Sequence, residues 1–319
     1  MSNDLLASLK FVQGAVAKKD FVPELCHFHI KDGQVKGYNG ILGISCPIAL
    51  NLDVTPNATQ FVKAIQTCKE TVALHVTDGG RLAIKSGKFR AFIDCIPGDF
   101  PEVGPEGIPI KIENGILPAL KILAPFIAED ASRQWARGIL LRGDSAFATN
   151  NVALLQYWLG SPFPIDLNIP KAAVAELLRI GEEPVEVLVA DASVTFKFEG
   201  DRWLRTQTYD LAWPDVTPIL DRPSTQQTVP DGLWEAVEDL SPFVDDIGRL
   251  FLSEGKISTS TEDGAGASVD IANPHAGCYH FKQLALLSKV VQTIDLSCYP
   301  LPALFTGDRI RGALSGIRY

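Results

Sequence analysis

The residue types best suited to catalysis or metal binding in this sequence are five histidines and six cysteines. Cys26-His27-Phe28-His29 brings both types together, and it could indicate a metal site or a Cys/His pair. Alternate residues of a strand share a face, so His27 and His29 would lie together while Cys26 points away. Two histidines without a third ligand fall short of a zinc site. We expect a strand edge here, with no metal and no cofactor.

Motifs of the common enzyme classes do not occur in the sequence. There is no nucleophile elbow, no HExxH pair and no glycine-rich phosphate loop, because residues 78–80 and 264–266 have the character of turns. The cysteines lack CxxC spacing and mostly lie in apolar runs, so we expect reduced core thiols at positions 26, 46, 68, 95, 278 and 298. A Cys/His hydrolase remains the less favoured alternative.

The 319 residues are 46% hydrophobic and 21% charged, with a net charge of -9. This composition is typical of a globular protein of two or three domains. No apolar run approaches the ~20 residues of a membrane span, and the first residues do not resemble a signal peptide. We therefore expect a cytoplasmic protein. An evenly spread acidic charge would disfavour nucleic acid as a partner.

Two segments of the chain share an unusual pattern of residues. Gly87 and Gly200 each lie 14 positions before a proline, Pro101 and Pro214. In both copies an aromatic residue precedes that proline, and an acidic residue and a valine follow it. A third glycine segment, at residues 306–311, comes 107 residues after the second. Recurrence at a period of roughly a hundred residues indicates internal repeats of domain size.

Other landmarks recur in the same order and near the same period. Leu-Ala-Pro-Phe-Ile at 123–127 returns as Leu-Ser-Pro-Phe-Val at 240–244, and residues 37–40 correspond to 148–151. We therefore predict three tandem domains, called the first, second and third repeat below, with boundaries at 1–111, 112–225 and 226–319.

Each repeat has the same predicted internal order. A helix with apolar residues at i, i+3 and i+4 opens it, short alternating strands follow, and a second helix precedes the closing strands. Few helices and runs of strands favour an α+β fold, with two helices per repeat backed by antiparallel sheets. The expected helices are 4–19, 56–68, 117–129, 170–180, 232–246 and 281–294, and turns are expected at 32–33, 142–144 and 254–255.

Positive charge is concentrated on the expected helices. Five of the six carry net charges between 0 and +2 that add to +6, although the whole chain is at -9. The exception, residues 232–246, carries five acidic side chains and no basic one. A basic helical layer on an acidic body would attract a phosphate backbone, but solvated helix faces also favour lysine. Charge alone leaves both interpretations open, and it leaves the acidic helix unexplained.

Together these features resemble the bacterial-type sliding clamp, the β subunit of DNA polymerase III. The most specific match lies in the second repeat, at residues 119–121, 130–133, 138–141 and 148–151. Ile169-Pro170-Lys171 and Trp213-Pro214-Asp215 also match, with Trp in place of the family's usual Phe. Where the family usually reads Ala-Thr-Asp-Gly-His-Arg-Leu, this chain replaces the Asp, Gly, His and Arg, within residues 148–154. The resemblance covers the whole chain but is distant. Compactness and divergence together suggest a bacteriophage-encoded version, and the resemblance implies a bacterial or phage-infected host cell.

The resemblance implies a processivity factor for DNA replication that has no active site. Family members form a head-to-tail homodimer, a six-domain ring whose helices line a central hole. Such a ring encircles double-stranded DNA without reading its sequence and tethers the replicative polymerase. The implied DNA-facing residues, of which Lys19 is the leading candidate, are Lys10, Lys18, Lys19, Lys63, Lys121, Arg133, Lys171, Arg179, Lys282 and Lys289.

The resemblance also implies a groove between the second and third repeats that accepts short linear peptides from the DNA polymerase and the clamp loader. An apolar pocket with a few polar groups suits an extended peptide. The matching residues are Ala136, Thr149, Asn151, Val152, Ala153, Leu154, Pro214, Ile219, Ala313, Leu314, Ser315 and Arg318. The alternative to a ring is a monomeric clamp-like scaffold, or an inhibitor that mimics a clamp.

Overall fold

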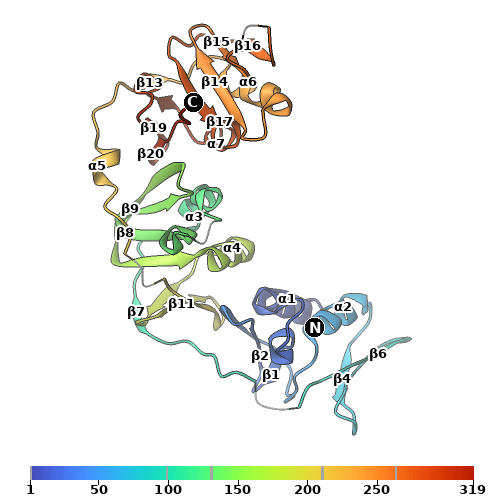
Figure 1. The fold of residues 1–319 in the computed structure, drawn as a ribbon. Helices are drawn as coiled ribbons and strands as arrows, with labels where there is room; N and C mark the ends of the chain where they lie inside the picture. Colours follow the sequence, from blue (N-terminus) through green and yellow to red (C-terminus); the bar gives the residue numbers. More distant parts are fainter. Residues whose placement is uncertain (1, 98–99, 130–131, 210–211, 263) are drawn as a thin grey trace. The chain divides into compact units, whose positions relative to one another are not determined.

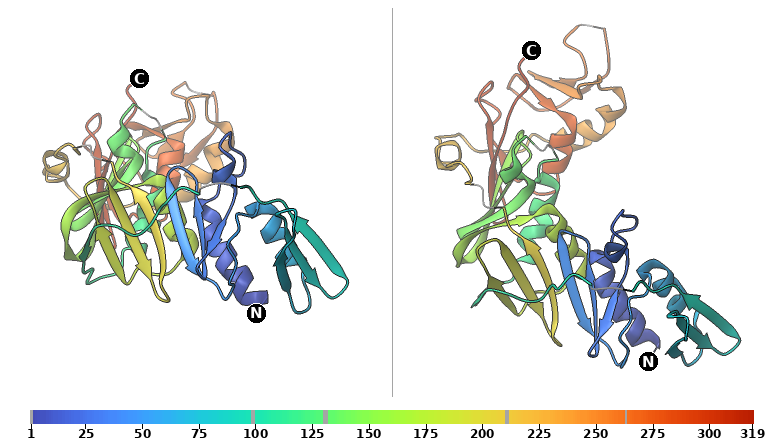
Figure 2. Two further views of the ribbon diagram at one scale, coloured as in Figure 1. Left: turned by 90° about the horizontal axis from the view of Figure 1, so that it is seen from below. Right: turned by 60° about the horizontal axis from the view of Figure 1, so that its bottom comes forward.

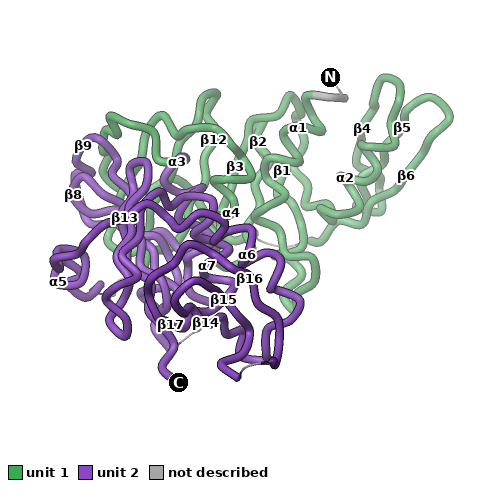
Figure 3. Tube along the Cα trace, turned by 90° about the horizontal axis from the view of Figure 1, so that it is seen from above, with its two compact units in different colours: residues 1–117, 172–209 green, residues 118–171, 210–319 purple. Residues whose placement is uncertain are grey.

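The computed structural model describes residues 2–97, 100–129, 132–209, 212–262 and 264–319 (Figure 1). Asp99 of the first repeated motif, and Asp130 and Ala131 of the family match, lie outside the described residues. The chain divides into two compact units (Figure 3). Unit 1 comprises residues 1–117 and 172–209, and unit 2 comprises residues 118–171 and 210–319. Unit 1 thus joins the first repeat to the later part of the second.

The helices of the described residues are short. The α-helices are α1 Ser2–Val12, α2 Ala58–Thr67, α3 Leu117–Leu123, α4 Lys171–Ile180, α5 Thr217–Leu220, α6 Leu233–Leu240 and α7 Phe281–Leu287. The 3-10 helices are η1 Gln13–Ala15, η2 Pro23–Cys26, η3 Ala124–Phe126, η4 Gln134–Arg137 and η5 Ser241–Phe243. The side chain of Asn57 accepts a hydrogen bond from Gln60 N and so begins α2.

The opening helix of each repeat ends in the same way. α1, α3 and α6 stop at Val12, Leu123 and Leu240, and each is followed directly by a three-residue 3-10 helix. Two of these 3-10 helices carry a proline, Pro125 or Pro242, which cannot donate the hydrogen bond that would extend the α-helix. The recurrence predicted from residues 123–127 and 240–244 therefore corresponds to a shared local structure.

Unit 1 contains an antiparallel seven-stranded sheet and a separate three-stranded one. The larger sheet has the order β1 His29–Lys31, β2 Gln34–Tyr38, β3 Leu42–Pro47, β12 Arg202–Gln207, β11 Ser193–Phe198, β10 Glu186–Val189 and β7 Ile108–Ile110. Its strands come from two repeats, which meet where β3 pairs with β12. The smaller sheet consists of β4 Ala73–Val76, β5 Leu82–Ser86 and β6 Phe89–Ile93.

Unit 2 repeats this arrangement. Its six-stranded sheet has the order β13 Gln227–Thr228, β18 Thr293–Ile294, β19 Ala303–Gly307, β20 Ile310–Leu314, β9 Ala153–Pro170 and β8 Gly138–Thr149. The second and third repeats meet where β9 pairs with β20. A separate four-stranded sheet has the order β16 Ser268–Asp270, β15 Lys256–Ser258, β14 Arg249–Ser253 and β17 Gly277–His280.

Helices cover one face of these sheets and form the cores with them. α1 packs on β2 and β3 (Figure 2) and buries Leu9 and Val12 completely. α6 packs on β15 and β16, and α2 packs on β6. The helices present apolar residues at i, i+3 and i+4, and the sheets present alternate residues, so each layer buries one face.

Several local predictions were wrong. The helices expected at 4–19, 117–129 and 232–246 end early, at Val12, Leu123 and Leu240, each followed by a short 3-10 helix. The turn expected at residues 142–144 is an irregularity within β8, where the pairing with β9 shifts on either side of Gly143. Gly143 has φ +55°, a conformation in which glycine alone carries no steric penalty. The helix expected at 281–294 ends at Leu287, and Thr293–Ile294 instead forms β18, because β-branched residues favour the sheet edge.

Candidate nucleic-acid interface and partner groove

All ten basic residues proposed to face DNA are exposed. Those of unit 1 lie on α1, on α2, on the last turn of α4 and just after η1. Those of unit 2 lie on α3, at the start of α4, just before η4, and on or just after α7. Helices thus carry six of these ten charges.

Three of these cations are engaged within the protein. Lys171 forms an ion pair with Glu129, which holds the pKa of that carboxyl group below its usual value. Arg179 donates from Nη1 to Lys10 O (3.1 Å) and from Nη2 to Phe11 O (2.7 Å), at the carboxyl end of α1. Arg133 donates to Asn151 Oδ1 at 3.2 Å. These side chains therefore also position neighbouring elements.

The acidic helix keeps its charge on the surface. Glu235, Glu238 and Asp239 of α6 are exposed, while Ala236, Val237 and Leu240 are buried. Because α1, α3 and α6 end alike, Glu238 occupies the helix position of Lys10 and Lys121. The described residues offer these three carboxylates no ion pair.

The replaced family motif forms a tight turn between β8 and β9. The side chain of Asn150 accepts hydrogen bonds from Val152 N (3.1 Å) and Ala153 N (2.9 Å), and Thr149 Oγ1 donates to Ala153 O. Asn151 has φ +71°, which asparagine tolerates better than most residues. Short side chains that bond the local backbone thus hold this turn without the family's Asp and Gly.

Beside this turn, unit 2 carries an apolar cluster built around Trp213. Its ring contacts Trp135 edge to face, with the ring centroids 4.9 Å apart. Trp213 Nε1 is buried, and no acceptor lies within reach among the described residues. The buried members besides Trp213 are Leu140, Phe147, Leu154 and Leu220, with Trp135 and Val216 packed against them.

The proposed groove residues lie on two faces of the six-stranded sheet. Leu154 pairs with Ala313, and Ala153 pairs with Leu314. Neighbouring pairs point to opposite faces, so Leu154 and Ala313 share the face of the cluster, whereas Ala153 and Leu314 are fully buried on the other. Ser315 N donates to Val152 O and joins the end of β20 to the turn.

The remaining groove candidates border the cluster or lie apart from it. Pro214 and Ile219 are exposed and adjoin buried cluster residues in sequence, Ala136 is fully buried, and Arg318 is exposed. Apart from Leu154, the proposed groove set missed the residues of the cluster: Trp135, Leu140, Phe147, Trp213, Val216 and Leu220. The alternation of apolar and polar residues in parts of 138–149 could have indicated that Leu140 and Phe147 are buried.

In unit 1, residues 100–107, called the first linker, hold the place in the repeat that the segment after Trp213 holds in unit 2. Phe100 stacks on His29 with the ring centroids 5.0 Å apart, and Arg205 forms an ion pair with Glu106. The cavity beside this linker measures about 1010 Å³ and has mixed charge, with Lys31, Lys36, Asp53 and Glu102 among its lining residues. Phe100 and Trp213 hold the same place in the repeated motif and both are buried, but Phe100 borders a cavity of mixed charge, whereas Trp213 lies in an apolar cluster.

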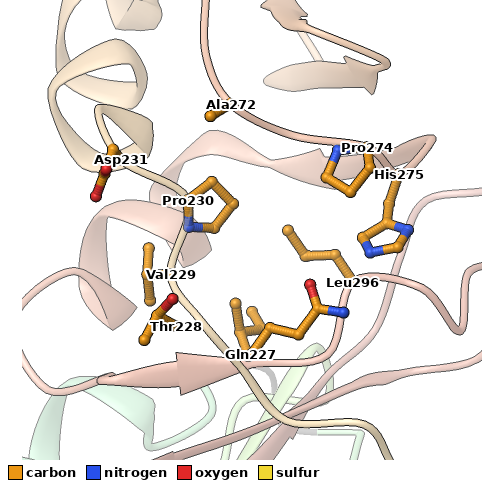
Figure 4. A pocket seen from close by; sticks show the side chains of 10 residues that line it. Gln227, Thr228, Val229, Pro230, Asp231, Ala272, Pro274, His275 and Leu296 are labelled. Atoms are coloured by element: carbon orange, nitrogen blue, oxygen red, sulfur yellow. The ribbon is translucent and has the colours of Figure 1, made fainter.

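A second cavity, the potential metal ligands and the Cys278 thiol give little support for catalysis or metal binding. A cavity of about 250 Å³ in the third repeat, bordered by Pro230, His275 and Leu296 (Figure 4), has Asp231 as the only Asp, Glu, Lys or Arg in its lining. Within the described residues no three His, Cys, Asp or Glu side chains cluster as a metal would require. Burial raises the pKa of the Cys278 thiol to about 11, which disfavours the thiolate that a nucleophile needs.

Solved structures share this architecture over the whole chain, whereas no family model and no curated protein matches the sequence. The Bartonella birtlesii DnaN sliding clamp, bound to griselimycin, superposes with a TM-score of 0.84 at 20% identity. The Caulobacter crescentus β sliding clamp gives 0.82 at 18%. Each comparison covers 100% of this chain and 98% of the other. This chain has the fold of a bacterial β sliding clamp.

One of the similar solved structures contains a bound peptide. The Helicobacter pylori β clamp was solved bound to a DNA ligase peptide, and it matches 99% of this chain with a TM-score of 0.81 at 20% identity.

No helix among the described residues combines the length and the apolar character needed to cross a membrane.

Proposed function

We propose that this protein is a DNA sliding clamp, a head-to-tail homodimeric ring that encircles duplex DNA and tethers the replicative polymerase. The clamp fold, shared over the full length of both compared chains, carries the proposal. The ten exposed basic residues support a sequence-independent contact with phosphates. In this role the protein catalyses no reaction, because a ring holds DNA by enclosing it.

The way in which sheets are shared supports ring closure. Each seam joins a strand from the first half of one repeat to the last strand of the next, β3 to β12 and β9 to β20. The three repeats of one chain form two such seams, so two chains contain four. Two more form between the chains, which makes six, if each third repeat joins the first repeat of the other chain.

Retention on circular DNA tests the proposal. A loaded ring stays on a closed plasmid and leaves when the plasmid is linearised, whereas a surface-bound protein does not distinguish the two forms. Lys18→Glu with Lys19→Glu should reduce loading and lower the salt slope of DNA binding by about 2, at ~0.9 per lost phosphate contact. Lys111→Glu, an exposed lysine outside the candidate set, is the control. Equal retention on both plasmid forms would contradict encirclement.

The apolar cluster supports binding of short linear peptides from the polymerase and the clamp loader. Its exposed border, Pro214 and Ile219, adjoins in sequence the buried side chains of Trp213 and Leu220. Ile219→Asp should weaken binding of a polymerase-derived peptide in a fluorescence titration, while Ile247→Asp, another exposed isoleucine, should leave it unchanged. The rival proposal is a monomeric clamp-like scaffold or an inhibitor that mimics a clamp, and light scattering that shows only monomer would favour it.

A further inference from the structure

Strands β1 and β2, at one edge of the seven-stranded sheet, carry four hydrogen-bond donors on one face. His29 of β1 pairs with Lys36 of β2, and Lys31 pairs with Gln34. Residues two apart in a strand share a face, so these four side chains form two adjacent rows of one surface. Val35, on the opposite face, is fully buried. The four donors therefore lie on the solvent side of the sheet.

The four side chains line a pocket of about 90 Å³, called the donor pocket below, together with Asp32. Ser45 Oγ donates to Gln34 Oε1 at 3.1 Å, so the amide N–H groups of Gln34 remain to donate to a ligand. Within the described part of the chain no ion pair involves Lys36. A pocket with four donors and one carboxylate suits a ligand with anionic oxygen atoms.

The charges around the donor pocket determine which anion fits. Lys31, Lys36, Asp32 and Asp53 all act electrostatically on His29. Lys31 and Asp53 form a loose ion pair, with 3.9 Å between Nζ and Oδ2. These four charges cancel, so a monoanion would be balanced by one proton on His29, whereas the second charge of a dianion would stay unbalanced. The donor pocket therefore favours a carboxylate over a phosphate dianion.

The donor pocket shares its lining with the larger cavity beside the first linker. His29, Lys31, Asp32 and Lys36 line both, and the larger cavity measures about 1010 Å³. A carboxylate group alone would leave most of that volume empty, whereas several residues of an extended peptide would use it. The first linker offers such a peptide an apolar surface, with Phe100, Pro101, Val103 and Pro105 among the lining residues.

We propose that this cavity is a peptide site of its own, in which an Asp or Glu side chain of an extended segment places its carboxylate on His29, Lys31 and Lys36 while an apolar side chain packs against the first linker. Phe100 and Trp213 hold the same place in the repeats, so the site corresponds in unit 1 to the apolar cluster of unit 2. The two places would recognise peptides of different chemistry. The site lies within one unit of one chain, so this inference goes beyond the proposed ring and does not rest on it.

Binding of a carboxylate at this site would be linked to protonation of His29. In the free protein burial lowers the pKa of His29, with Lys36 and Lys31 acting in the same direction and Asp53 and Asp32 opposing them. A bound carboxylate adds a negative charge beside the ring and so raises that pKa. The affinity should therefore increase as the pH falls from the raised pKa to the lowered one, by at most about tenfold per pH unit.

The carboxylates of the first linker would oppose such a ligand. Glu106 is already held by Arg205 and by Ser193 Oγ, which donates to it at 2.6 Å. Glu102 is exposed and lines the same cavity. Glu102→Gln should therefore strengthen the binding of an acidic peptide, because it removes a like charge.

Isothermal titration calorimetry on the full-length protein tests the site. The probes are a capped hexapeptide, Gly-Ser-Glu-Leu-Gly-Ser, and the same peptide with Gln in place of Glu. The wild type should bind the Glu peptide at least about tenfold more tightly than the Gln peptide. Lys36→Gln should remove most of this preference, whereas Lys88→Gln, at an exposed lysine between β5 and β6, should retain it.

The ring resonances of His29, identified by their loss in His29→Gln, provide a second readout. The Glu peptide should raise the pKa of His29 in an NMR titration, and the Gln peptide should not. If the Glu peptide binds no more tightly than the Gln peptide, or if Lys36→Gln binds it like the wild type, the proposal is wrong. Acetate and inorganic phosphate are the remaining probes. If either binds as tightly as the Glu peptide, the donor pocket holds free anions and the assignment to a peptide fails.

Discussion

Trp135 and Trp213 meet edge to face with their ring centroids 4.9 Å apart, although 78 residues separate them in the chain. Trp135 lies in η4, and Trp213 belongs to the repeated motif that precedes α5. The contact fixes the start of the segment that leads from the second repeat to the third. The buried Nε1 of Trp213, without an acceptor among the described residues, makes this a packed site with one unmet hydrogen bond.

Two substitutions of Trp213 distinguish the contribution of its ring packing to stability from that of its buried N–H group. Trp213→Ala should lower the free energy of unfolding by about 3–5 kcal/mol, because it leaves a cavity in the cluster. Trp213→Phe should change it by less than about 1 kcal/mol, because two effects oppose each other. The smaller ring packs less well, but the substitution removes a buried N–H donor whose burial without an acceptor costs about 1–3 kcal/mol. Urea unfolding measures both. Equal losses in the two variants would show that the N–H is satisfied.

The shared local structure of residues 123–127 and 240–244 could be predicted from the sequence, because it depends on side chains that act locally. Pro125 and Pro242 prevent the α-helix from continuing beyond Leu123 and Leu240, although the helices expected from the apolar spacing extend to residues 129 and 246. The apolar cluster could not be predicted in the same way. Trp135, Leu140 and Trp213 are far apart in the chain, and only the pairing of β8 with β9 and the path of the linker bring them together.

The errors in the sequence analysis have the same origin. Residues 142–144 have the composition of a turn, but strand pairing on both sides of Gly143 makes the chain continue through it. Residues 288–294 continue the apolar spacing of α7, yet Thr293 and Ile294 pair with β19 instead. In both segments long-range hydrogen bonds outweigh a local preference.

Arg179 provides a test of structural against DNA-binding roles. Arg179→Met should lower the free energy of unfolding by about 1.5–3 kcal/mol, because hydrogen bonds from a charged group to Lys10 O and Phe11 O are lost. Lys63→Met, at an exposed lysine of α2, should change it by less than about 0.5 kcal/mol. If Arg179→Met unfolds like the wild type and only DNA retention falls, Arg179 acts solely as a DNA contact.

Gly43 allows the first linker to lie against the sheet. A Cβ atom at this position would be 2.5 Å from Val103 Cγ1, with Trp203 behind it at 3.5 Å. Gly43→Ala should therefore destabilise the protein by about 1–3 kcal/mol. Addition of Val103→Ala should recover part of that loss, which a double-mutant cycle measures as coupling. Gly79→Ala, with only Thr77 within 4 Å, is the matched control. Additive effects at 43 and 103 would argue against the contact.

His29 makes stability depend on pH. Burial lowers its pKa below the ordinary 6.5, and Lys36 and Lys31 act in the same direction, while Asp53 and Asp32 oppose them. The unfolded chain therefore takes up a proton near pH 6.5, where the folded protein does not, so stability should decrease as the pH falls from 6.5 toward the lowered pKa. His29→Phe keeps a ring against Phe100 and should reduce this decrease in urea unfolding measured across that range. Burial also lowers the pKa of His280, so a smaller dependence should remain. An unchanged pH profile in His29→Phe would show that His29 takes up its proton equally in both states.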